Sequence, residues 1–374
     1  MDPHERNLPP AHLVIDGAYG TGLNRPYDFA TTAAPVLAID IPSGVDGRTG
    51  SLHGRAPFAA HTITFAALKP GLLLTPGAGR TGHIEVADVG LDVTSARAWL
   101  FTGDDAAEHL PRRADHAHKW NNAVMVVGGS PGMNGAPILA AEAALRSGCG
   151  LVRCGLVGGA TTTPGSPVVF EELPASAWSG PVLDRLGEGR FRSLVIGPGL
   201  APDTHSDTQA VLTGSSDLPT VVDGTALRLL GLRPNTGSNV VLTPHDGEFL
   251  SLAGAPPDLD RFASARALAS DTGSVVLLKG PCTIVAAPDG RCLAVAHGDS
   301  RLATAGSGDV LSGAIATQLA SGVEPFLAAA LGAWLHADAG HRLPLVGGVA
   351  SDLVELLADS ASALAVHGGH RAPN

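Results

Sequence analysis

Residues 304–309, Thr-Ala-Gly-Ser-Gly-Asp, combine features that suit phosphate chemistry. Their small side chains let the backbone approach a ligand closely. The segment that follows has apolar residues at helical spacing, so free N–H groups at the start of a helix would face an anion. Asp309 would lie in the first helical turn, where its carboxylate can accept a proton from a substrate hydroxyl. The alternative is a glycine-rich turn in which Asp309 is an ordinary helix N-cap.

Four further signals each follow a predicted strand, at residues 194–196, 220–222, 240–242 and 275–278. In chain order they are Gly197-Pro198-Gly199, Asp223, Thr243-Pro244-His245 and Lys279-Gly280. In an open α/β sheet, ligands bind at the carboxyl ends of the strands. Together with the loop at 304–309, these signals predict a single large cleft along one edge of a sheet.

These signals also have structural interpretations. The turn at 197–199 is equally well explained as punctuation after a strand. For Asp223 taken alone, capping of the helix that follows is the favoured interpretation. His245 could bind a phosphate or a ring hydroxyl, or be a polar loop residue. Glu248 suits the first turn of a helix, where the helix dipole favours an acid.

Lys279 stands between a strand and a predicted hairpin formed by residues 283–286 and 292–295. It could pair with a phosphate group or mark the end of a buried strand. Pro281 removes one donor of strand pairing, which leaves the neighbouring backbone open to a nucleotide.

A second candidate phosphate loop, at residues 20–26, follows a predicted strand at 13–16. Asp40 ends another predicted strand and suits a ribose hydroxyl, as acids at that position do in dinucleotide-binding folds. Asp16 and Ser43 offer hard oxygen ligands for a cation. Ordinary turn chemistry is the alternative for all of these residues.

The elements that must position these residues differ along the chain. Residues 12–90 contain short apolar runs typical of buried parallel strands, but only 27–34 and 57–61 could form connecting helices. This part therefore looks like half of a domain. Residues 92–114 look like a polar connection.

From Asn121 onward, strands and helices alternate regularly. The strand at 123–127 precedes an Ala-rich helix at 136–146, and residues 303–338 supply two more helices. This pattern predicts an open α/β sheet with helices on both sides.

Bulk composition excludes several classes. The 374 residues suffice for two domains, and the net charge of −11 argues against nucleic acid as the main partner. No apolar run approaches the ~20 residues of a membrane span, and the N-terminus has no signal-peptide core. The four cysteines lack the spacing of a zinc site, so we expect reduced, partly buried thiols in a soluble cytoplasmic protein.

Residues 112–368 resemble the ADP/ATP-dependent NAD(P)H-hydrate dehydratase family, which has the ribokinase-like three-layer α/β/α fold. The matching stretches occur in order: Asp115-His116 with His118-Lys119, Gly135-Ala136-Pro137, Gly197-Pro198-Gly199-Leu200, Thr243-Pro244-His245 with Glu248, Leu278-Lys279-Gly280, and Gly306-Ser307-Gly308-Asp309. The resemblance implies dehydration of the S form of hydrated NADH or NADPH. ADP or ATP would be the co-substrate, with Mg²⁺ beside it.

The resemblance also implies roles for particular residues. Asp309 would be the catalytic carboxylate. The hydrated dinucleotide would contact Ala136, Gly199, His245 and Asp309. The adenine nucleotide would contact Lys279, Gly280, Pro281, Cys282, Thr283 and Gly308. Two positions depart from the family pattern: Trp120 follows Lys119, and Ala201 follows Leu200, where the family usually has Gly.

Residues 12–92 resemble the second half of the NAD(P)H-hydrate epimerase domain that is often fused ahead of the dehydratase, a partial Rossmann-like segment. The implied dinucleotide contacts are Gly20, Thr21, Gly22, Leu23, Asn24, Arg25, Pro26 and Asp40, and Asp16 with Ser43 would keep part of a K⁺ site. The first half of that domain has no counterpart, which argues against epimerase activity from this chain alone. We expect this segment at 1–95, a linker at 96–114 and the dehydratase domain at 115–370.

Two other functions fit part of the pattern. A vitamin or sugar kinase of the same fold would share the glycine loop and Asp309, but it would release a stable phosphorylated product. A catalytically inactive nucleotide-binding regulator is favoured only by the incomplete N-terminal half. We expect hydrated NAD(P)H as the substrate and a homo-oligomeric state.

Overall fold

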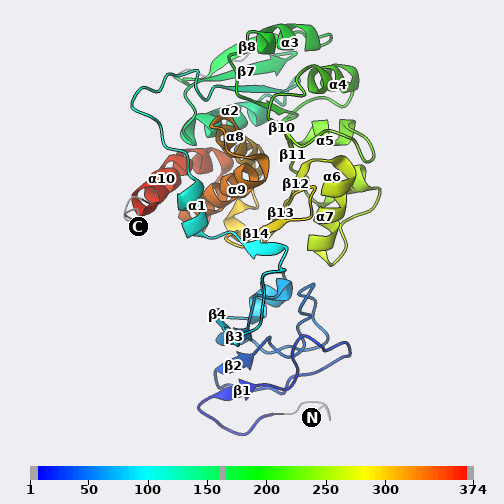
Figure 1. The fold of residues 1–374 in the computed structure, drawn as a ribbon, viewed down its shortest axis with the longest axis vertical. Helices are drawn as coiled ribbons and strands as arrows, with labels where there is room; N and C mark the ends of the chain where they lie inside the picture. The colour runs from blue at the N-terminus through cyan, green and yellow to red at the C-terminus, as the bar shows by residue number, and fades with distance from the viewer. Residues whose placement is uncertain (1–6, 160–164, 369–374) are drawn as a thin grey trace. The chain divides into compact units, whose positions relative to one another are not determined.

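The structure is a computed structural model that describes residues 7–159 and 165–368. The chain divides into two compact units, drawn in Figure 1 and described here separately. The N-terminal unit comprises the chain up to Arg97 together with Asp258–Arg261. The C-terminal unit comprises Ala98–Pro257 and the chain from Phe262 onward.

The N-terminal unit contains a four-stranded parallel sheet in the order β1-β2-β3-β4. Its elements are β1 (Val14–Asp16), β2 (Val36–Ile39), β3 (His61–Phe65), β4 (His83–Ala87) and two 3-10 turns, η1 (Pro70–Leu72) and η2 (Gly77–Arg80). To within two residues, the four strands match the apolar runs at 13–16, 36–41, 62–65 and 84–86 that the sequence predicts as strands. A small core of Ile41, Val45, Ala56 and Leu72 packs beside the sheet.

The helices considered at 27–34 and 57–61 do not form, which corrects that expectation. The N–H groups of Tyr27 and Phe29 instead donate to the carbonyls of His53 and Arg55. This pairing keeps the segment extended, so parallel strands here are joined by loops without a helical crossover.

The C-terminal unit contains a ten-stranded sheet in the order β5-β14-β13-β12-β11-β10-β9-β6-β7-β8. Neighbouring strands are parallel except at the β12–β13 and β13–β14 pairs, and the β13–β14 pair is the predicted hairpin. The strands are β5 (Ala98–Leu100), β6 (Val124–Gly128), β7 (Val152–Val157), β8 (Val169–Leu173), β9 (Ser193–Ile196), β10 (Thr220–Val222), β11 (Val240–Leu242), β12 (Val275–Leu278), β13 (Thr283–Ala286) and β14 (Cys292–Val295).

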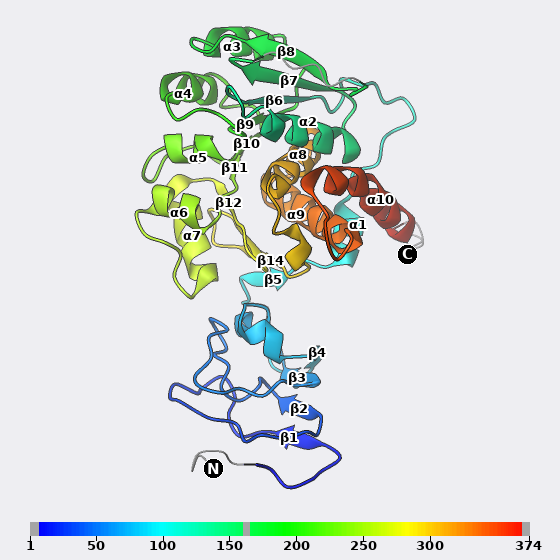
Figure 2. The same ribbon diagram turned by 180° about the vertical axis from the view of Figure 1, so that it is seen from behind.

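Helices cover both faces of this sheet, which gives three layers. Figures 1 and 2 show α1, α2, α8, α9 and α10 on one face and α3 to α7 on the other. The helices are α1 (Gly103–His109), α2 (Gly135–Arg146), α3 (Ser179–Gly187), α4 (His205–Gly214), α5 (Thr225–Leu229), α6 (Asp246–Ala253), α7 (Arg261–Thr272), α8 (Ser307–Ala320), α9 (Pro325–Arg342) and α10 (Ala350–Gly368), with the 3-10 turn η3 (Ser300–Leu302).

Helix α8 is the centre of the helical layer, and nearly all of its residues are buried. Gly313 lies so close to α2 that an added Cβ would be 2.0 Å from the carbonyl oxygen of Ala140. On its other side, an added Cβ at Gly332 of α9 would be 2.6 Å from Ile315. These two glycines let the three helices approach one another closely, which fixes the spacing between α8 and its neighbours α2 and α9.

Residues 96–114, expected to be a linker, contain two ordered elements. Strand β5 pairs with β14, and α1 begins with a capping box in which Thr102 and Asp105 exchange hydrogen bonds. The polar residues that suggested a connection are thus the ones that begin helix α1. The domain boundaries themselves stay predictions.

All four cysteines are buried thiols outside disulfides, and burial raises the pKa of the Cys149 thiol to about 12. Among the described residues, no helix is long and apolar enough to cross a membrane. The cytoplasmic location and the homo-oligomeric state stay predictions.

Candidate functional site

The loop at 304–309 leads into α8 as predicted, with Asp309 in the first turn. Gly306 is the N-cap, and its φ of 91° lies in the left-handed region that favours glycine. The N-cap interpretation of Asp309 is therefore wrong. A larger residue at 306 would also collide with Leu139 of α2, because an added Cβ would lie 2.6 Å from that side chain.

Asp223 lies at the centre of the charged groups behind this loop. It is fully buried at the carboxyl end of β10, and Lys279 Nζ donates to its Oδ1 at 2.8 Å. Thr243 Oγ1 donates to Oδ1 at 2.8 Å, and Ser312 Oγ of α8 donates to Oδ2 at 2.7 Å. The capping role expected for Asp223 is wrong, since Gly224 caps α5 without any side-chain bond.

Lys279 follows β12 and lies beside the loop at 304–309. Its ammonium is 2.8 Å from Asp223 and 3.7 Å from Glu248. Burial by itself lowers the pKa of Lys279, but the carboxylates of Asp223 and Glu248 outweigh it and raise that pKa. Lys279 is therefore a charged group that is held in place by carboxylates on neighbouring elements.

Asp309 experiences the opposite environment. Burial raises the pKa of its carboxyl group to about 7, the charge of Asp223 adds to the rise, and Lys279 opposes it. Such a group exchanges its proton near neutral pH, which is what a general base requires. An anion can bind at the N-terminus of a helix. When a hydroxyl oxygen attacks that anion, a carboxyl group of this kind beside it can accept the hydroxyl proton.

His245 begins α6 and caps it. The ring Nδ1 of His245 accepts from the backbone N–H of Gly247 at 2.9 Å. The backbone N–H of His245 donates to Oε2 of Glu248 at 3.0 Å. Glu248 thus occupies the first turn, as predicted, and is also buried against Lys279. The side chain of His245 is 51% exposed, and its Nε2 lies 3.5 Å from Oε1 of Glu248, so the ring is partly accessible to a ligand.

The glycine turn after β9 has the strained geometry that its sequence suggests. Gly197 and Gly199 have φ angles of 123° and 68°. An added Cβ at Gly199 would be 2.3 Å from the carbonyl oxygen of Met133 and 3.4 Å from the Cβ of Ala136. Ala136 and Gly199, both predicted substrate contacts, are therefore neighbours.

Residues 279–282 connect β12 to β13 beside the loop at 304–309. An added Cβ at Gly308 would lie 3.4 Å from Lys279 Nζ, so these two predicted nucleotide contacts are close together. Thr283 Oγ1 donates to the carbonyl of Gly280 at 3.3 Å, and Cys282 is buried. The predicted cleft and the roles of individual residues stay predictions.

The N-terminal unit also brings its predicted residues together. Ser43 donates to Asp16 from its hydroxyl at 2.6 Å and from its N–H at 2.7 Å. Asp40, with a φ of 72°, pairs with Lys69 at 2.7 Å. An added Cβ at Gly20 would be 2.8 Å from Asp40, so the loop at 20–26 begins beside this acid.

Sequence reasoning did not identify Ser312 or His336 as members of the site. Ser312 lies one helical turn after Asp309, a spacing that could have found it. His336 of α9 lies with Nε2 at 2.9 Å from the carbonyl oxygen of Ser307. Burial lowers the pKa of His336 to about 4, so this ring is neutral and supports the loop through a hydrogen bond.

Residues 124–361, more than half of the chain, match the family model described as NAD(P)H-hydrate dehydratase. This chain belongs to the NAD(P)H-hydrate dehydratase family. Residues 1–71 match the model described as YjeF-related protein N-terminus. The expected dehydratase function, a lyase reaction of nucleotide repair, is confirmed at this level.

Curated relatives of this dehydratase match along most of its length. The bifunctional NAD(P)H-hydrate repair enzyme Nnr of Moorella thermoacetica is 38% identical over 385 residues, covering 93% of this chain and 72% of the relative. The enzyme of the same name from Escherichia coli is 33% identical over 373 residues, covering 92% and 70%.

Solved structures agree with the fold. The ADP/ATP-dependent NAD(P)H-hydrate dehydratase from Bacillus subtilis, co-crystallised with ATP and Mg²⁺, has a TM-score of 0.61 and 25% identity, covering 71% of this chain and 98% of that one. A ribokinase-like superfamily protein from Enterococcus faecalis has a TM-score of 0.62 and 22% identity, covering 74% and 99%. The ribokinase-like fold is therefore confirmed for this dehydratase.

Proposed function

We propose that this chain returns the S form of hydrated NADH and NADPH to the reduced dinucleotide, consuming one ADP or ATP per turnover. The observation that carries the proposal is Asp309, whose pKa of about 7 matches the task and which lies in the first turn of α8. A carboxyl with this pKa is about half ionised at neutral pH, so it can accept the proton of a ring hydroxyl.

The reaction that we propose has two steps. The hydroxyl oxygen of the hydrated ring attacks the terminal phosphorus atom of the nucleotide, and its proton goes to Asp309. The bond from that phosphorus to its bridging oxygen breaks, so ATP becomes ADP or ADP becomes AMP. The ring C–O bond then breaks, phosphate leaves with the electron pair, and loss of a proton from the adjacent ring carbon restores the double bond.

The chain supports the first step through the loop before α8. We assign the amides at 306–308 to the transferring phosphoryl group, because a helix start favours an anion. Lys279 lies beside Gly308, and the carboxylates of Asp223 and Glu248 keep its ammonium group protonated. Asp223 acts as a positioning residue, since it touches both Lys279 and Ser312 of α8.

Ligand contacts follow from the same arrangement. We assign the hydrated dinucleotide to Ala136, Gly199 and His245, of which the first two are neighbours and the third is half exposed. We assign the adenine nucleotide to residues 279–283 and Gly308. This stretch ends at Thr283, where the antiparallel hairpin of β13 and β14 begins.

Magnesium and potassium stay predictions. Among the described residues, no group of three His, Cys, Asp or Glu side chains is arranged to hold a metal ion. The carboxylates of Asp223 and Glu248 are already bonded to Lys279. We therefore assign no step to a protein-bound metal, and Mg²⁺ would enter bound to nucleotide phosphates.

The experiment is a repair assay. The purified chain is incubated with S-hydrated NADH and either ADP or ATP, and the return of the reduced-nicotinamide absorbance is followed. We expect absorbance to return only when a nucleotide is present, with one AMP or ADP formed per NADH. No return with either nucleotide would contradict the proposal.

Product analysis separates this proposal from a kinase of the same fold. A dehydratase releases inorganic phosphate in step with NADH. A kinase would instead leave a stable phosphorylated product and no free phosphate. The matched control is the Asp217→Asn variant, which changes an exposed carboxyl group of the same unit and should repair the hydrate at the normal rate.

A further inference from the structure

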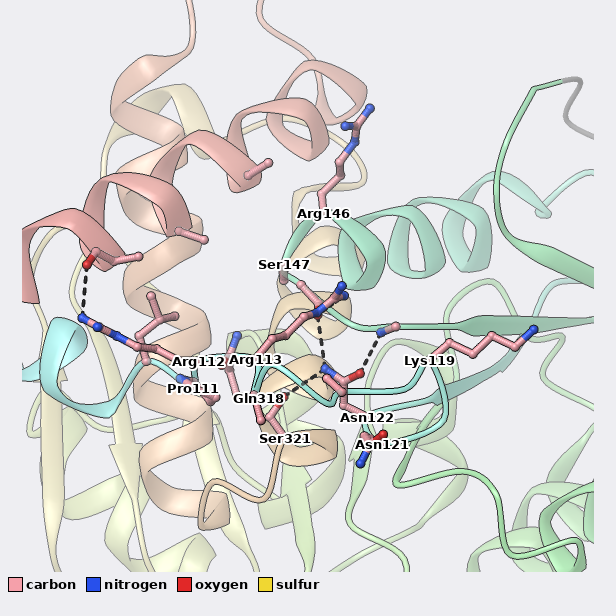
Figure 3. Close-up of a pocket in the computed structure, with 18 of the residues that line it drawn as sticks. Pro111, Arg112, Arg113, Lys119, Asn121, Asn122, Arg146, Ser147, Gln318 and Ser321 are labelled. Atoms are coloured by element: carbon pink, nitrogen blue, oxygen red, sulfur yellow. Dashed lines mark hydrogen bonds between the residues drawn. The ribbon is translucent and has the colours of Figure 1, made fainter. Parts of the chain in front are cut away.

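A cavity of about 970 Å³ opens in the C-terminal unit away from the loop at 304–309. Figure 3 shows it among the segment before β6, the end of α2 and the end of α8. Gln318 and Ser321 line it, whereas Asp309 lies in the first turn of the same 14-residue helix. At 1.5 Å per residue, these two ends of α8 are about 20 Å apart. The cavity is therefore separate from the proposed catalytic site.

The charge of the lining differs from that of the whole chain. Arg112, Arg113, Lys119 and Arg146 line the cavity with two histidines, His116 and His118. Within the described residues no Asp or Glu lines it, although the net charge of the chain is −11. A concentration of cations in one hollow of an acidic protein raises the local concentration of anions.

Three of these cations have no carboxylate partner in the part of the chain that the structure describes. Arg112 donates to the carbonyl of Ala365 at 3.3 Å, and Arg113 donates to the carbonyls of Gly148 and Cys149 at 2.8 and 2.9 Å. Lys119 lies 5.9 Å from the centre of the Trp120 ring. Carbonyls and rings are neutral, so these contacts leave the positive charges uncompensated.

The ends of two helices act against this charge. The carbonyl ends of α2 and α8 face the cavity and by themselves favour a cation. Their last turns are partly satisfied, because Ser147 and Ser321 donate backbone N–H bonds to Ala143 and Thr317. A helix end carries about half a charge, which three unpaired cations exceed.

One wall of the cavity is made of small residues on α10, the helix whose Ala365 carbonyl accepts from Arg112. Ala358, Ala361, Ser362 and Ala365 line the cavity at helical spacing, so they share one face of the helix. Their short side chains leave a flat, largely apolar surface. A ring can lie against such a surface while charged groups on the same ligand reach the cations.

We propose that this basic cavity binds a phosphorylated metabolite of nucleotide size. Its phosphate groups bind Arg112, Arg113 and Lys119, and its ring lies against the small residues of α10. The volume is within the range of small-molecule sites, about 300–1,000 Å³. The proposal is independent of the function assigned to Asp309.

The test is hydrogen exchange of the full-length protein, read by peptides covering 110–122 and 145–150, in the presence of pyrophosphate, ADP or adenosine. The test variant is Arg112→Gln/Lys119→Gln, which removes two exposed cations and leaves Arg113 to hold its loop. The control variant is Arg228→Gln, an exposed arginine on α5 outside the lining. Peptides covering 304–312 report binding at the catalytic loop.

We expect ADP to protect the cavity peptides at lower concentration than pyrophosphate, and adenosine to leave them unprotected. In the double variant the concentration needed should rise tenfold or more, while protection of 304–312 stays normal. The Arg228→Gln variant should behave as the parent chain.

Three outcomes would overturn the proposal. The first is no protection of 110–122 by either anion, and the second is equal protection in the double variant. The third is a change of oligomeric state in the double variant by size-exclusion chromatography with light scattering, which would make this face an interface between copies.

Discussion

Asp309 and Asp223 are two carboxyl groups of one cluster with opposite protonation behaviour. Burial and the neighbouring acids raise the pKa of Asp309 to about 7, whereas Lys279 and two hydroxyl donors outweigh burial at Asp223 and lower its pKa. Asp223 therefore stays ionised while Asp309 exchanges a proton. Asp223 is thus suited to keep a negative charge, and Asp309 is suited to transfer a proton.

Replacing Asp309 by Asn should remove the proton acceptor and keep the shape of the side chain. We expect turnover in the repair assay to fall by about 10²–10⁴-fold, the usual contribution of a general base. ADP binding, measured by calorimetry, should change less than threefold. Loss of ADP binding in this variant would show that Asp309 is a structural residue.

The pH dependence of kcat/KM should report the ionisation of Asp309. Because the base acts when deprotonated, activity should rise with pH and level off above about 7. The charge of Asp223 raises the pKa of Asp309, so Asp223→Asn should move the rise to lower pH, by roughly one unit.

Ser312→Ala is the control for that experiment, since it removes a hydrogen bond to Asp223 and keeps the charge. Its pH profile should coincide with that of the parent chain. An unchanged profile in Asp223→Asn, with folding verified by circular dichroism, would contradict the assigned coupling.

At the scale of elements, the contact between α2 and α8 decides where Ala136 and Asp309 lie relative to each other. Gly313→Ala would place a methyl carbon 2.0 Å from the carbonyl oxygen of Ala140, where only backbone could yield. We expect the variant to be less stable by about 1–3 kcal/mol and to lose most of its turnover. Thermal denaturation and the repair assay measure both effects.

Gly180→Ala is the matched control, because Gly180 is exposed in α3 and an added Cβ would meet nothing within 4 Å. This variant should be as stable as the parent chain or more stable by up to about 1 kcal/mol, since alanine favours helix. Similar losses in both variants would contradict the assignment of the loss at Gly313 to the close contact with α2.

At the scale of the whole molecule, the two units should differ in activity. In the N-terminal unit Asp16 is bonded to Ser43 and Asp40 to Lys69, so the carboxylates expected to bind a cation and a dinucleotide already have partners within the unit. We expect this chain to consume S-hydrated NADH and leave the R form unrepaired, measured by chromatography of the two epimers. Equal consumption would contradict this prediction.

The sequence predicts those structural features best that depend on interactions between residues close together in the chain. Strands β10, β11 and β12 were predicted to the residue, because each is a short apolar run bounded by polar or glycine residues. Strands β7 and β8 were missed because charged residues interrupt them. Arg153 of β7 pairs with Glu171 of β8 at 3.0 Å, and no local pattern reveals such a pair.

The same limit applies to the site. The loop at 304–309 and the position of Asp309 follow from neighbouring residues, so they were predicted correctly. Asp223 was interpreted as a helix cap because its partners are distant. Lys279 is 56 residues away along the chain and Ser312 is 89 residues away, and only the assembled sheet brings them together.

The glycine contact between α2 and α8 also bears on how this core can change by mutation. A backbone-to-backbone contact has no rotamers, so its spacing is set by peptide geometry and is the same whatever side chains surround it. Exchanges among Ala, Val and Leu elsewhere in the core can alter local volume without altering that spacing. The interior can therefore drift in sequence while the separation between the starts of α2 and α8 is preserved.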